Sequence, residues 1–533
     1  MKSGMITTPA FWQRWFVRGI GCVVLIYLGV LAVQVALRVA FPWDLFTWAE
    51  SPFMTDMLKL DSGHPIYEDP ADGNSFVYSP GLTYLTWAVL KPLGLHLDIR
   101  FCRVVIVVIG VLAGMVAGAG VRQALRMIAP QLRLPHLGWL SAGLAVLVIF
   151  RNFNADATHP DNLVMFHTAG LLWLTLKAVQ SRSFGWAVAV MIFSALGVFA
   201  KQTLCVAFIG PALVFLRLKP WELRTRVALV VIGVVASGVA LAALWYPEFA
   251  RFYTWEVLTR QKIYVSRFYW MLVDLLHSDR ALLLVLGAAA IPILWRSDKA
   301  GRRYLEIWAW LGLFSVTPGA LAYAKIYGTW NNIIIYQLWL LLLVLPALSV
   351  WLGRLNAAKL ELHAPFNFVL ATVVTGFVLM LLPTRYPADR TMYDCCAAVQ
   401  SRVTLDLKAG RRVLVAYGTM YQLRAGSREI PLDRACSIGD LRAAGISSRV
   451  KLVERVRAHY YDRLYLAVEE WYDDDMRRAI HEHYLIDEVI PRPDCHDRLE
   501  VGRSLSLIGE CKIMSPRPTV AAELTWPPKS NPQ

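Results

Sequence analysis

The sequence predicts an α-helical membrane protein with many spans, followed by a small α/β region. Three observations predict this fold class. Hydrophobic residues make up 56% of the 533 residues and the mean hydropathy is +0.45, more than a soluble domain of this size needs. Several apolar runs approach the roughly 20 residues with which a helix crosses a bilayer. After residue 384 the chain becomes charged, and no further run of that length follows.

The apolar runs predict about eleven transmembrane helices within a membrane domain of residues 1–383. The first run, Gly19 to Ala40, is too long for the core of a signal peptide, and no Ala-x-Ala cleavage pattern follows it, so we expect it to be retained. The predicted spans lie near residues 17–40, 101–121, 137–151, 162–178, 185–199, 203–217, 227–245, 280–296, 304–324, 332–352 and 366–383.

One further run, residues 82–97, is apolar but contains Lys91, Pro92 and Gly94. As a full span it would invert every later loop and place the basic loops outside. We therefore expect an interfacial or re-entrant helix within the first outer loop, residues 41–100. Non-helical backbone at that depth is tolerated only where protein covers it.

The charged loops predict the orientation of the chain. The formal net charge is +15, a value that also occurs in nucleic-acid-binding proteins. Here most Lys and Arg residues lie in short loops between predicted spans, and such loops face the cytoplasm. The sequence therefore predicts a cytoplasmic N-terminus and no nucleic-acid partner. The loops predicted to face outward are 41–100, 152–161, 200–202, 246–279 and 325–331, together with everything after residue 384.

Residues 384–515 are predicted to form a soluble α/β domain on the outer side, and residues 516–533 a Pro-rich flexible tail. Segments 412–417, 461–468 and 485–490 read as strands, and 473–484 as an amphipathic helix. Five cysteines lie in this part of the chain without a zinc-binding pattern. An oxidising outer compartment would permit disulfides. The candidate pairs are Cys495 with Cys511, and Cys395 or Cys396 with Cys436.

Polar residues that are costly near hydrocarbon gather on the predicted outer side. Asp44 and Glu50 follow directly on the first span, and Lys201 lies in a tight turn between two apolar segments. The candidate residues are Asp44, Glu50, Asp56 and Asp61 in the first outer loop, Asp156, His159 and Asp161 in the second, Lys201 in the third, Arg251, Arg260, Lys262 and Arg267 in the fourth, and Lys325, Tyr327, Trp330, Asn331 and Asn332 in the fifth.

Each of these residues also has a structural interpretation. We expect Asp56 and Asp61 to be solvated loop residues and His159 to be a structural hydrogen-bonding residue. Asp161, beside Pro160, is either a helix N-cap or a functional acid. Lys201 is expected to bind an anion. The cations of the fourth loop hold either lipid headgroups or a donor phosphate.

Together these residue types favour one reaction. A carboxylate can deprotonate an acceptor hydroxyl within its reach. Cations can hold and stabilise a leaving phosphate. A groove embedded in the bilayer suits a lipid-linked donor. Glycosyl transfer from a polyprenyl phosphate needs all three features.

Short motifs carry a resemblance to a known family. Asp44-Leu-Phe-Thr-Trp-Ala-Glu50 is similar to the pattern Asp-Glu-x-x-Tyr-Ala-Glu, and two further motifs follow at Gly63-His-Pro-Ile-Tyr67 and Tyr78-Ser-Pro-Gly-Leu-Thr-Tyr84. With the order of spans and the outer domain, they make residues 1–385 resemble the GT-C membrane glycosyltransferases. Bacterial lipid A aminoarabinose transferases and protein O-mannosyltransferases are the most similar members. Leu45 replaces the second acid of the motif, and Ser79 stands where the aminoarabinose transferases carry Lys.

This resemblance implies an inverting transferase in a bacterial inner membrane. Asp44 would be the base and Glu50 its support. The second-loop residues Asp156, His159 and Asp161 would line the acceptor side, and Lys201 would hold the donor phosphate together with Arg251, Arg260 or Lys262. The implied partners are a polyprenyl-phosphate sugar donor, a glycan, glycolipid or protein acceptor, and membrane lipid. No cofactor is certain. A divalent cation stays open, although Leu45 weakens any metal site built on the acid pair.

Two other classes of protein remain as alternatives. A transporter or a flippase for lipid-linked sugars would also place charges in the membrane, but such proteins often carry paired repeats with a site near the midplane. The sequence shows no repeat, and its polar residues gather on one side. The third alternative is an assembly or scaffold protein whose working part is residues 384–533.

Overall fold

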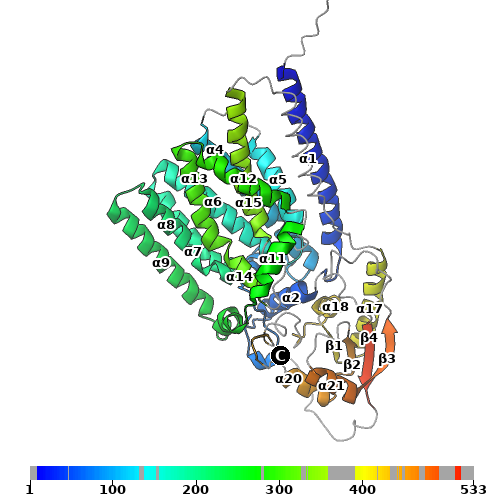
Figure 1. Cartoon of the computed structure of the whole chain (residues 1–533). Coiled ribbons are helices and arrows are strands. Elements are labelled where there is room, and N and C mark those ends of the chain that lie inside the picture. The colour runs from blue at the N-terminus through cyan, green and yellow to red at the C-terminus, as the bar shows by residue number, and fades with distance from the viewer. Residues whose placement is uncertain are drawn as a thin grey trace, which may run out of the picture.

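The computed structural model describes residues 9–45, 47–130, 137–151, 155–277, 281–325, 332, 334–357, 390–416, 418–431, 441, 443–446, 450–466, 474–490 and 511–517. These residues form a bundle of helices and, at one end of it, a smaller region built on a four-stranded sheet (Figure 1). The predicted span 366–383, Cys436, Cys495 and the tail beyond residue 517 lie outside the described residues.

Ten of the predicted spans correspond to helices of the bundle. The helices are α1 Pro9–Ala40, α4 Ile99–Ile128, α5 Leu137–Arg151, α6 Asp161–Ser181, α7 Phe184–Ala200, α8 Ile209–Leu218, α9 Leu223–Trp245, α12 Ala281–Trp295, α13 Lys299–Ser315 and α15 Ile335–Ala357. In the described part of the chain, α4, α6, α9 and the stretch Lys299–Tyr323 are long and apolar enough to cross a membrane, and six more apolar helices are shorter. The chain is a multi-pass membrane protein, and the number of eleven spans stays a prediction.

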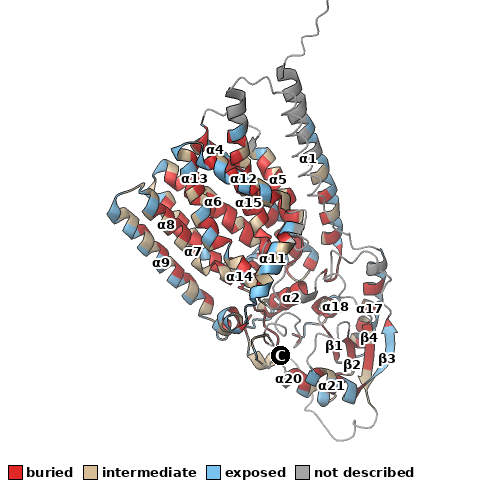
Figure 2. Cartoon of the chain, in the orientation of Figure 1, coloured by how far each residue is buried: buried red, intermediate tan, exposed pale blue. Residues whose placement is uncertain are grey.

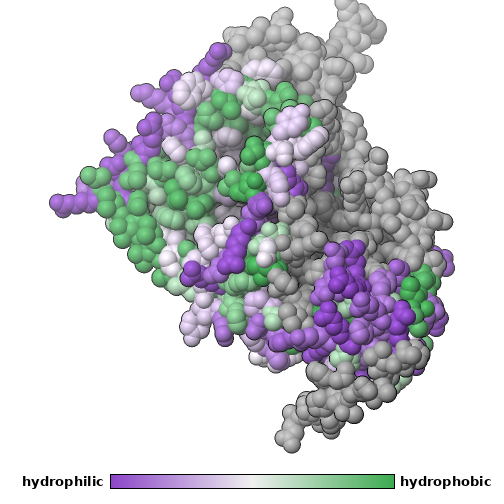
Figure 3. All heavy atoms as spheres, turned by 60° about the horizontal axis from the view of Figure 1, so that its bottom comes forward, coloured by the Kyte–Doolittle hydropathy of each residue, from purple (hydrophilic) through white to green (hydrophobic). Residues whose placement is uncertain are grey.

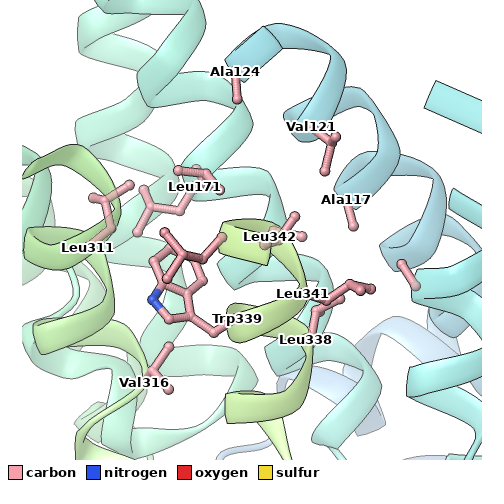
Figure 4. Packing of buried hydrophobic residues seen from close by; sticks show 14 of the residues in the cluster. Ala117, Val121, Ala124, Leu171, Leu311, Val316, Leu338, Trp339, Leu341 and Leu342 are labelled. Atoms are coloured by element: carbon pink, nitrogen blue, oxygen red, sulfur yellow. The ribbon is translucent and has the colours of Figure 1, made fainter. Parts of the chain in front are cut away.

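Small residues allow the central helices to pack closely. A Cβ at Gly114 of α4 would lie 2.4 Å from the Val146 side chain, and one at Gly118 would lie 2.5 Å from the Gly138 carbonyl oxygen. Glycine at these positions therefore brings α4 against α5, as small residues commonly do in membranes. On the other side of the core, Trp339 of α15 lies near Leu311 (Figure 4). Figure 2 shows that many of the buried residues lie on these middle helices.

One end of the bundle is covered by short elements, and we call it the α2 end. The elements between α1 and α4 are α2 Thr47–Asp61, η1 Pro70–Asp72, α3 Gly81–Leu90 and η2 Lys91–Leu93. Helix α3 has ten residues and is therefore about 15 Å long, too short to cross a bilayer. The elements between α7 and α15 that complete this part are η3 Gln202–Val206, η4 Phe252–Glu256, α10 Val257–Arg260, α11 Val265–His277 and α14 Pro318–Tyr323.

The expectation that Asp56 and Asp61 are solvated loop residues was wrong. Both lie in α2, and Asp56 is only 2% exposed. Asp61 ends the helix, where its carboxylate accepts from Lys91 and lies 2.8 Å from His96 Nε2. Burial alone would raise the pKa of Asp61, but the bonds from Lys91 and His96 outweigh it and lower that pKa.

The C-terminal part of the chain, residues 390–516, is called the sheet region below. Its elements are α17 Arg390–Lys408, β1 Val413–Val415, α18 Thr419–Arg424, α20 Val450–Arg457, β2 Arg463–Leu466, α21 Asp474–His483, β3 Tyr484–Ile490 and β4 Cys511–Pro516. The strand order is β1-β2-β4-β3; β1 runs parallel to β2, and β4 is antiparallel to both β2 and β3. The three predicted strands correspond to β1, β2 and β3, whereas β4 was not predicted.

The sheet region packs against the α2 end. Helix α18 contacts α2, and α20 contacts η1. An ion pair of 2.6 Å joins Lys451 of α20 to Asp72 of η1. Figure 3 shows hydrophilic residues gathered on the sheet region and a largely hydrophobic surface on the helical bundle beside it. The sheet region is therefore a polar cap on one end of a membrane bundle.

Candidate active site

Asp44 lies in the turn between α1 and α2 and is 4% exposed. Its Oδ2 accepts a hydrogen bond of 3.1 Å from Ser51 Oγ, while its Oδ1 is buried without a hydrogen-bond partner among the described residues. Burial, and next the charge of Glu50, raise the pKa of Asp44 well above its ordinary value, against the opposing effect of Arg103. A buried carboxylate with a raised pKa and one unengaged oxygen is suited to accept a proton.

Glu50 has a different environment, although it is just as deeply buried. Arg103 of α4 holds it with two bonds of 2.8 Å, from Nε to Oε1 and from Nη2 to Oε2. Neither side chain is exposed. The backbone N–H of Leu45 donates to Oε2 at 2.5 Å, and that of Thr158 donates to Oε1 at 3.3 Å. Glu50 is thus fixed by charge-assisted bonds on both oxygens, which suits a supporting role.

Arg103 also fixes the chain between α1 and Asp44. Its Nη1 donates to the carbonyl oxygens of Arg38, at 3.2 Å, and Phe41, and its Nη2 donates to that of Trp43 at 2.6 Å. Arg38 lies in the last turn of α1, where helix carbonyls lack intrahelical partners, and Phe41 and Trp43 follow the helix. One guanidinium therefore sets both the turn that carries Asp44 and the position of Glu50. We call Asp44, Glu50, Ser51 and Arg103 the acid centre.

Asp156 does not join Asp161 and His159, with which it was grouped as a second-loop acid. Its carboxylate is held by Arg38 of α1 through bonds of 2.7 Å from Nε and 3.1 Å from Nη2. The side chain of Asp156 is 0% exposed and that of Arg38 is 1% exposed. This buried, two-pronged ion pair ties the end of α1 to the segment before α6.

A second polar group, the lysine centre, consists of His159, Asp161, Lys201 and Asn332. Asp161 is the first residue of α6, and its carboxylate lies 3.0 Å from His159 Nδ1 and 3.5 Å from Lys201 Nζ. Lys201 Nζ also donates to Asn332 Oδ1 at 3.0 Å. The N-cap of α6 is Pro160, which makes no side-chain cap bond, so Asp161 is not an N-cap and instead holds Lys201.

The segment before α3 closes one side of the lysine centre. The Tyr78 ring lies 5.2 Å from that of His159 and 5.8 Å from Lys201 Nζ. Gln202 holds this segment, because its Oε1 accepts from Ser79 Oγ at 3.2 Å and its Nε2 donates to the Val77 carbonyl at 3.0 Å. A cavity of about 20 Å³, room for one water molecule, lies beside Lys201 and Asp161.

The acid and lysine centres are connected through the loop before α6. The backbone N–H of Thr158 donates to Glu50, and the next residue, His159, pairs with Asp161. The structure thus brings the predicted residues Asp44 and Glu50 together in one centre and His159, Asp161 and Lys201 in another. Thr158, whose N–H donates to Glu50, directly precedes His159 and so joins the two centres along the chain.

The cations of the fourth loop lie apart from both centres. Arg251 and Arg260 share Glu256, at 3.5 and 3.9 Å, and their side chains are 66% and 56% exposed. Lys262 is exposed as well. Among the described residues, no hydrogen bond or ion pair joins Arg251, Arg260 or Lys262 to Lys201. These exposed cations therefore do not form part of the lysine centre as the structure describes it.

The side chains of the acid centre are not arranged to bind a divalent cation. Both oxygens of Glu50 are bound to Arg103, so a guanidinium occupies the place where a metal would bind the acid pair. No group of three or more His, Cys, Asp or Glu side chains in the described ranges is arranged to hold a metal ion. In the sheet region Cys396 and Cys511 are free thiols, and the disulfide candidates Cys436 and Cys495 lie outside the described residues.

No family model matches this sequence, and no curated protein matches it either. Solved structures resemble its fold. ArnT from Cupriavidus metallidurans in the apo state, a GT-C lipid A aminoarabinose transferase, aligns over 92% of this chain and 97% of that chain, with a TM-score of 0.53 and 15% sequence identity. The chain shares the fold of this ArnT structure. The archaeal oligosaccharyltransferase AglB from Archaeoglobus fulgidus, in complex with an inhibitory peptide and a dolichol-phosphate, aligns more loosely, with a TM-score of 0.48, 11% identity and coverage of 89% and 73%.

Within this fold, Arg38 and Arg103 are site residues that were not predicted from the sequence. Both are fully buried, and each fixes one of the acids that the sequence singled out. Their signal was present, because each lies inside an apolar run predicted to be a span, where an ionisable residue is costly and needs a partner. The partners lie 118 and 53 residues away along the chain, and no local pattern identifies them.

Proposed function

We propose that this protein is a membrane glycosyltransferase that moves a sugar from a polyprenyl-phosphate donor to a hydroxyl group of a glycan, lipid or protein acceptor. The observation that carries the proposal is the state of Asp44. It is buried, has a raised pKa and keeps one oxygen without a hydrogen bond from the described residues. It lies at the α2 end of the bundle, which we assign to the outer face of a bacterial inner membrane because of the charges of the loops.

In the proposed reaction Asp44 is the general base. Its Oδ1 accepts the proton of the acceptor hydroxyl while that oxygen forms a bond to the anomeric carbon of the donor sugar. The bond from this carbon to the phosphate oxygen breaks, and its electron pair leaves with the polyprenyl phosphate. Attack from the side opposite the phosphate inverts the anomeric carbon. Glu50, held by Arg103, keeps the base in place.

The lysine centre is proposed to receive the leaving phosphate. Asp161 and Asn332 hold the ammonium of Lys201 in a fixed position before the donor arrives. A fixed cation stabilises developing negative charge without reorganisation during the reaction. In this proposal His159 and Asp161 lie on the phosphate side, beside Lys201, rather than on the acceptor side for which the sequence proposed them. Asp156 positions α1 through Arg38, and Arg251, Arg260 and Lys262 attract anionic lipids at the surface.

The polar residues favour an enzyme over a transporter or flippase. Arg38 lies in the last turn of α1, Arg103 in the second turn of α4, Asp161 begins α6 and Lys201 follows α7, so all four lie near helix ends that meet at the α2 end. A transport site is expected near the middle of the membrane, between broken helices. A one-sided site suits a reaction at a membrane surface.

The test compares Asp44→Asn with Asp98→Asn, which changes another acid of the α2 end that is 29% exposed. Surface glycans and glycolipids are measured by mass spectrometry in cells that carry equal amounts of each full-length variant. Asp44→Asn is expected to reduce the product that depends on this protein by at least about 100-fold, and Asp98→Asn to leave it near the wild-type level. A wild-type amount of product from Asp44→Asn would overturn the assignment.

A further inference from the structure

Helix α18 of the sheet region reaches the acid centre through Thr419. The backbone N–H of Thr419 donates to Ser51 Oγ at 2.9 Å, and the Thr419 hydroxyl lies 2.8 Å from that of Thr55. Thr55, Thr419 and Ser51 are 0%, 3% and 4% exposed. Water therefore does not compete for these bonds, and each is worth more than it would be at the surface.

The bond from Thr419 also orients the Ser51 hydroxyl. A backbone N–H can only donate, so Ser51 Oγ acts as the acceptor toward Thr419. The same hydroxyl donates to Asp44 Oδ2 at 3.1 Å. The result is a directed chain of bonds from Thr419 through Ser51 to Asp44, which leaves Asp44 Oδ1 for an incoming proton.

Trp43, the residue before Asp44, is held by the same region. Its indole Nε1 donates to Gln400 Oε1 of α17 at 3.0 Å, and its ring stacks on Tyr421 of α18 with centroids 6.3 Å apart. Gln400 Nε2 in turn donates to the Tyr421 carbonyl at 3.0 Å. The Arg424 guanidinium lies 5.1 Å from the Trp43 ring. The backbone on which Asp44 stands is thus fixed from the sheet region as well as by Arg103.

We propose that the sheet region is part of the active centre, with Ser51 and Thr419 acting as positioning residues that orient Asp44. This inference rests on the proposed role of Asp44 as base, but it concerns a different part of the chain. Neither residue needs to contact the donor or acceptor. The sheet region thereby acts on the base directly, in addition to any contact that it makes with the acceptor.

The pH at which Asp44 titrates can test this positioning role. The titratable groups near Asp44 come from α2, α4, α17 and α18. Glu50 of α2 raises the pKa of Asp44, and Arg103 of α4 lowers it. On α17 and α18, burial raises the pKa of Cys396 to about 12 and that of Tyr421 well above its ordinary value, so both are neutral near pH 7. The Ser51 bond lowers the pKa of Asp44, and its loss therefore raises that pKa.

The test variants are designed around Thr419, which is the first residue of α18. Proline is well tolerated at that position and lacks only the N–H there. Thr419→Pro removes the donor to Ser51 together with the hydroxyl, whereas the matched control Thr419→Ala removes the hydroxyl and keeps the N–H. Ser51→Ala removes the middle of the chain of bonds. All are made in the full-length protein and checked for folding by their melting temperature in detergent.

The readout is the titration of Asp44 itself, followed by the infrared band of its protonated carboxyl group in difference spectra against Asp44→Asn. This measurement needs no substrate. Ser51→Ala and Thr419→Pro are expected to move the midpoint to higher pH, while Thr419→Ala keeps the wild-type midpoint. Adding Thr419→Pro to Ser51→Ala should shift it no further, because both act through one path. Product formation in cells should fall at least about 10-fold in Ser51→Ala and Thr419→Pro.

Wild-type midpoints in both Ser51→Ala and Thr419→Pro would overturn this inference, and so would shifts that add. If Thr419→Pro does not fold, Ser51→Ala decides alone, since its midpoint either moves or stays. The outcome is separate from that of the proposed function. If the midpoint shifts in Ser51→Ala and Thr419→Pro but Asp44→Asn still makes the full amount of product, Ser51 and Thr419 position Asp44, and Asp44 is not the catalytic base. If Asp44→Asn is inactive but the midpoints of Ser51→Ala and Thr419→Pro do not shift, Asp44 is the base and the positioning role is rejected.

Discussion

Arg103 on α4 holds Glu50 on α2 by both carboxylate oxygens, each at 2.8 Å from a guanidinium nitrogen, with neither side chain exposed. This pair connects a membrane helix to the loop that carries Asp44. The acid centre therefore contains its own counter-ion.

Replacing Arg103 by Lys should destabilise the protein strongly and reduce its activity. Lys keeps the charge but cannot form the two-pronged bond to Glu50 or reach three backbone carbonyls. Breaking a buried ion pair costs about 3–5 kcal/mol, and retention of the charge makes the lower part of that range the expected loss. The measurement is the melting temperature of the detergent-purified protein.

The matched control is Arg100→Lys on the same helix. Arg100 is 46% exposed and pairs with Asp98, so its replacement should cost at most about 1 kcal/mol. Equal melting temperatures for the two variants would contradict the central role given to Arg103.

Asp156→Asn is expected to lower stability while leaving the chemistry intact. The substitution leaves the buried guanidinium of Arg38 without its counter-charge, which costs about 3–5 kcal/mol. Well below the melting temperature, the folded fraction should make product at close to the wild-type rate. A fully stable but inactive variant would instead place Asp156 among the groups that contact the acceptor.

Lys201→Met should abolish the binding of a polyprenyl phosphate. A ligand that binds the folded state raises its melting temperature by mass action. Polyprenyl phosphate added to the wild-type protein is therefore expected to raise its melting temperature, and to leave that of Lys201→Met unchanged. Lys177→Met is the control, because Lys177 lies over the Trp186 ring, at 3.5 Å from its centroid, rather than in the lysine centre. Equal stabilisation of all three proteins would refute the phosphate role.

Asp44→Asn should melt at a higher temperature than the wild type, increasingly so toward alkaline pH. The folded-state pKa of Asp44 is raised above the unfolded value of about 3.9. Its contribution to the free energy of unfolding is thus fully present below that value and is lost as pH rises through the folded pKa. Asn carries no such dependence.

A scan of melting temperature against pH measures this effect, with Asp98→Asn as a control of opposite sign. Burial opposes the shift at Asp98, but the bonds from the Arg100 side chain and backbone lower its pKa. Its stabilisation is therefore present above the unfolded pKa and is lost as pH falls. A pH-independent difference between wild type and Asp44→Asn would show that Asp44 is not a buried titrating acid.

The helices of the bundle could be predicted because hydrophobic length is a local property of the sequence. The same holds for the placement of Asp44 and Glu50, which follow the end of an apolar run. The prediction for Asp56 failed for a physical reason. Its burial depends on α2 packing beneath α3 and α18, and α18 lies more than 350 residues further along the chain.

The division of the polar residues into two centres could not be predicted either. The sequence places Asp156, His159 and Asp161 within six residues, yet they have different partners. Arg38 binds the first, and Lys201 binds the last. These partners come from the ends of α1 and α7, and only the packing of the helices decides which acid each one reaches. Strand β4 was not predicted, although it is longer than β1 and β2, because it is recognised by its pairing with β2 and β3 rather than by a local sequence pattern.

The contact between Thr55 and Thr419 spans 364 positions of the chain. At a synthesis rate of about 5–20 residues per second, roughly 20 to 70 s pass between the emergence of these two residues from the ribosome. The first loop is thus complete long before α18 exists. A nascent or truncated chain carries Asp44 without the Ser51–Thr419 bond. The order of biosynthesis therefore keeps the base unfinished until α18, about four fifths of the way along the 533 residues, has been made.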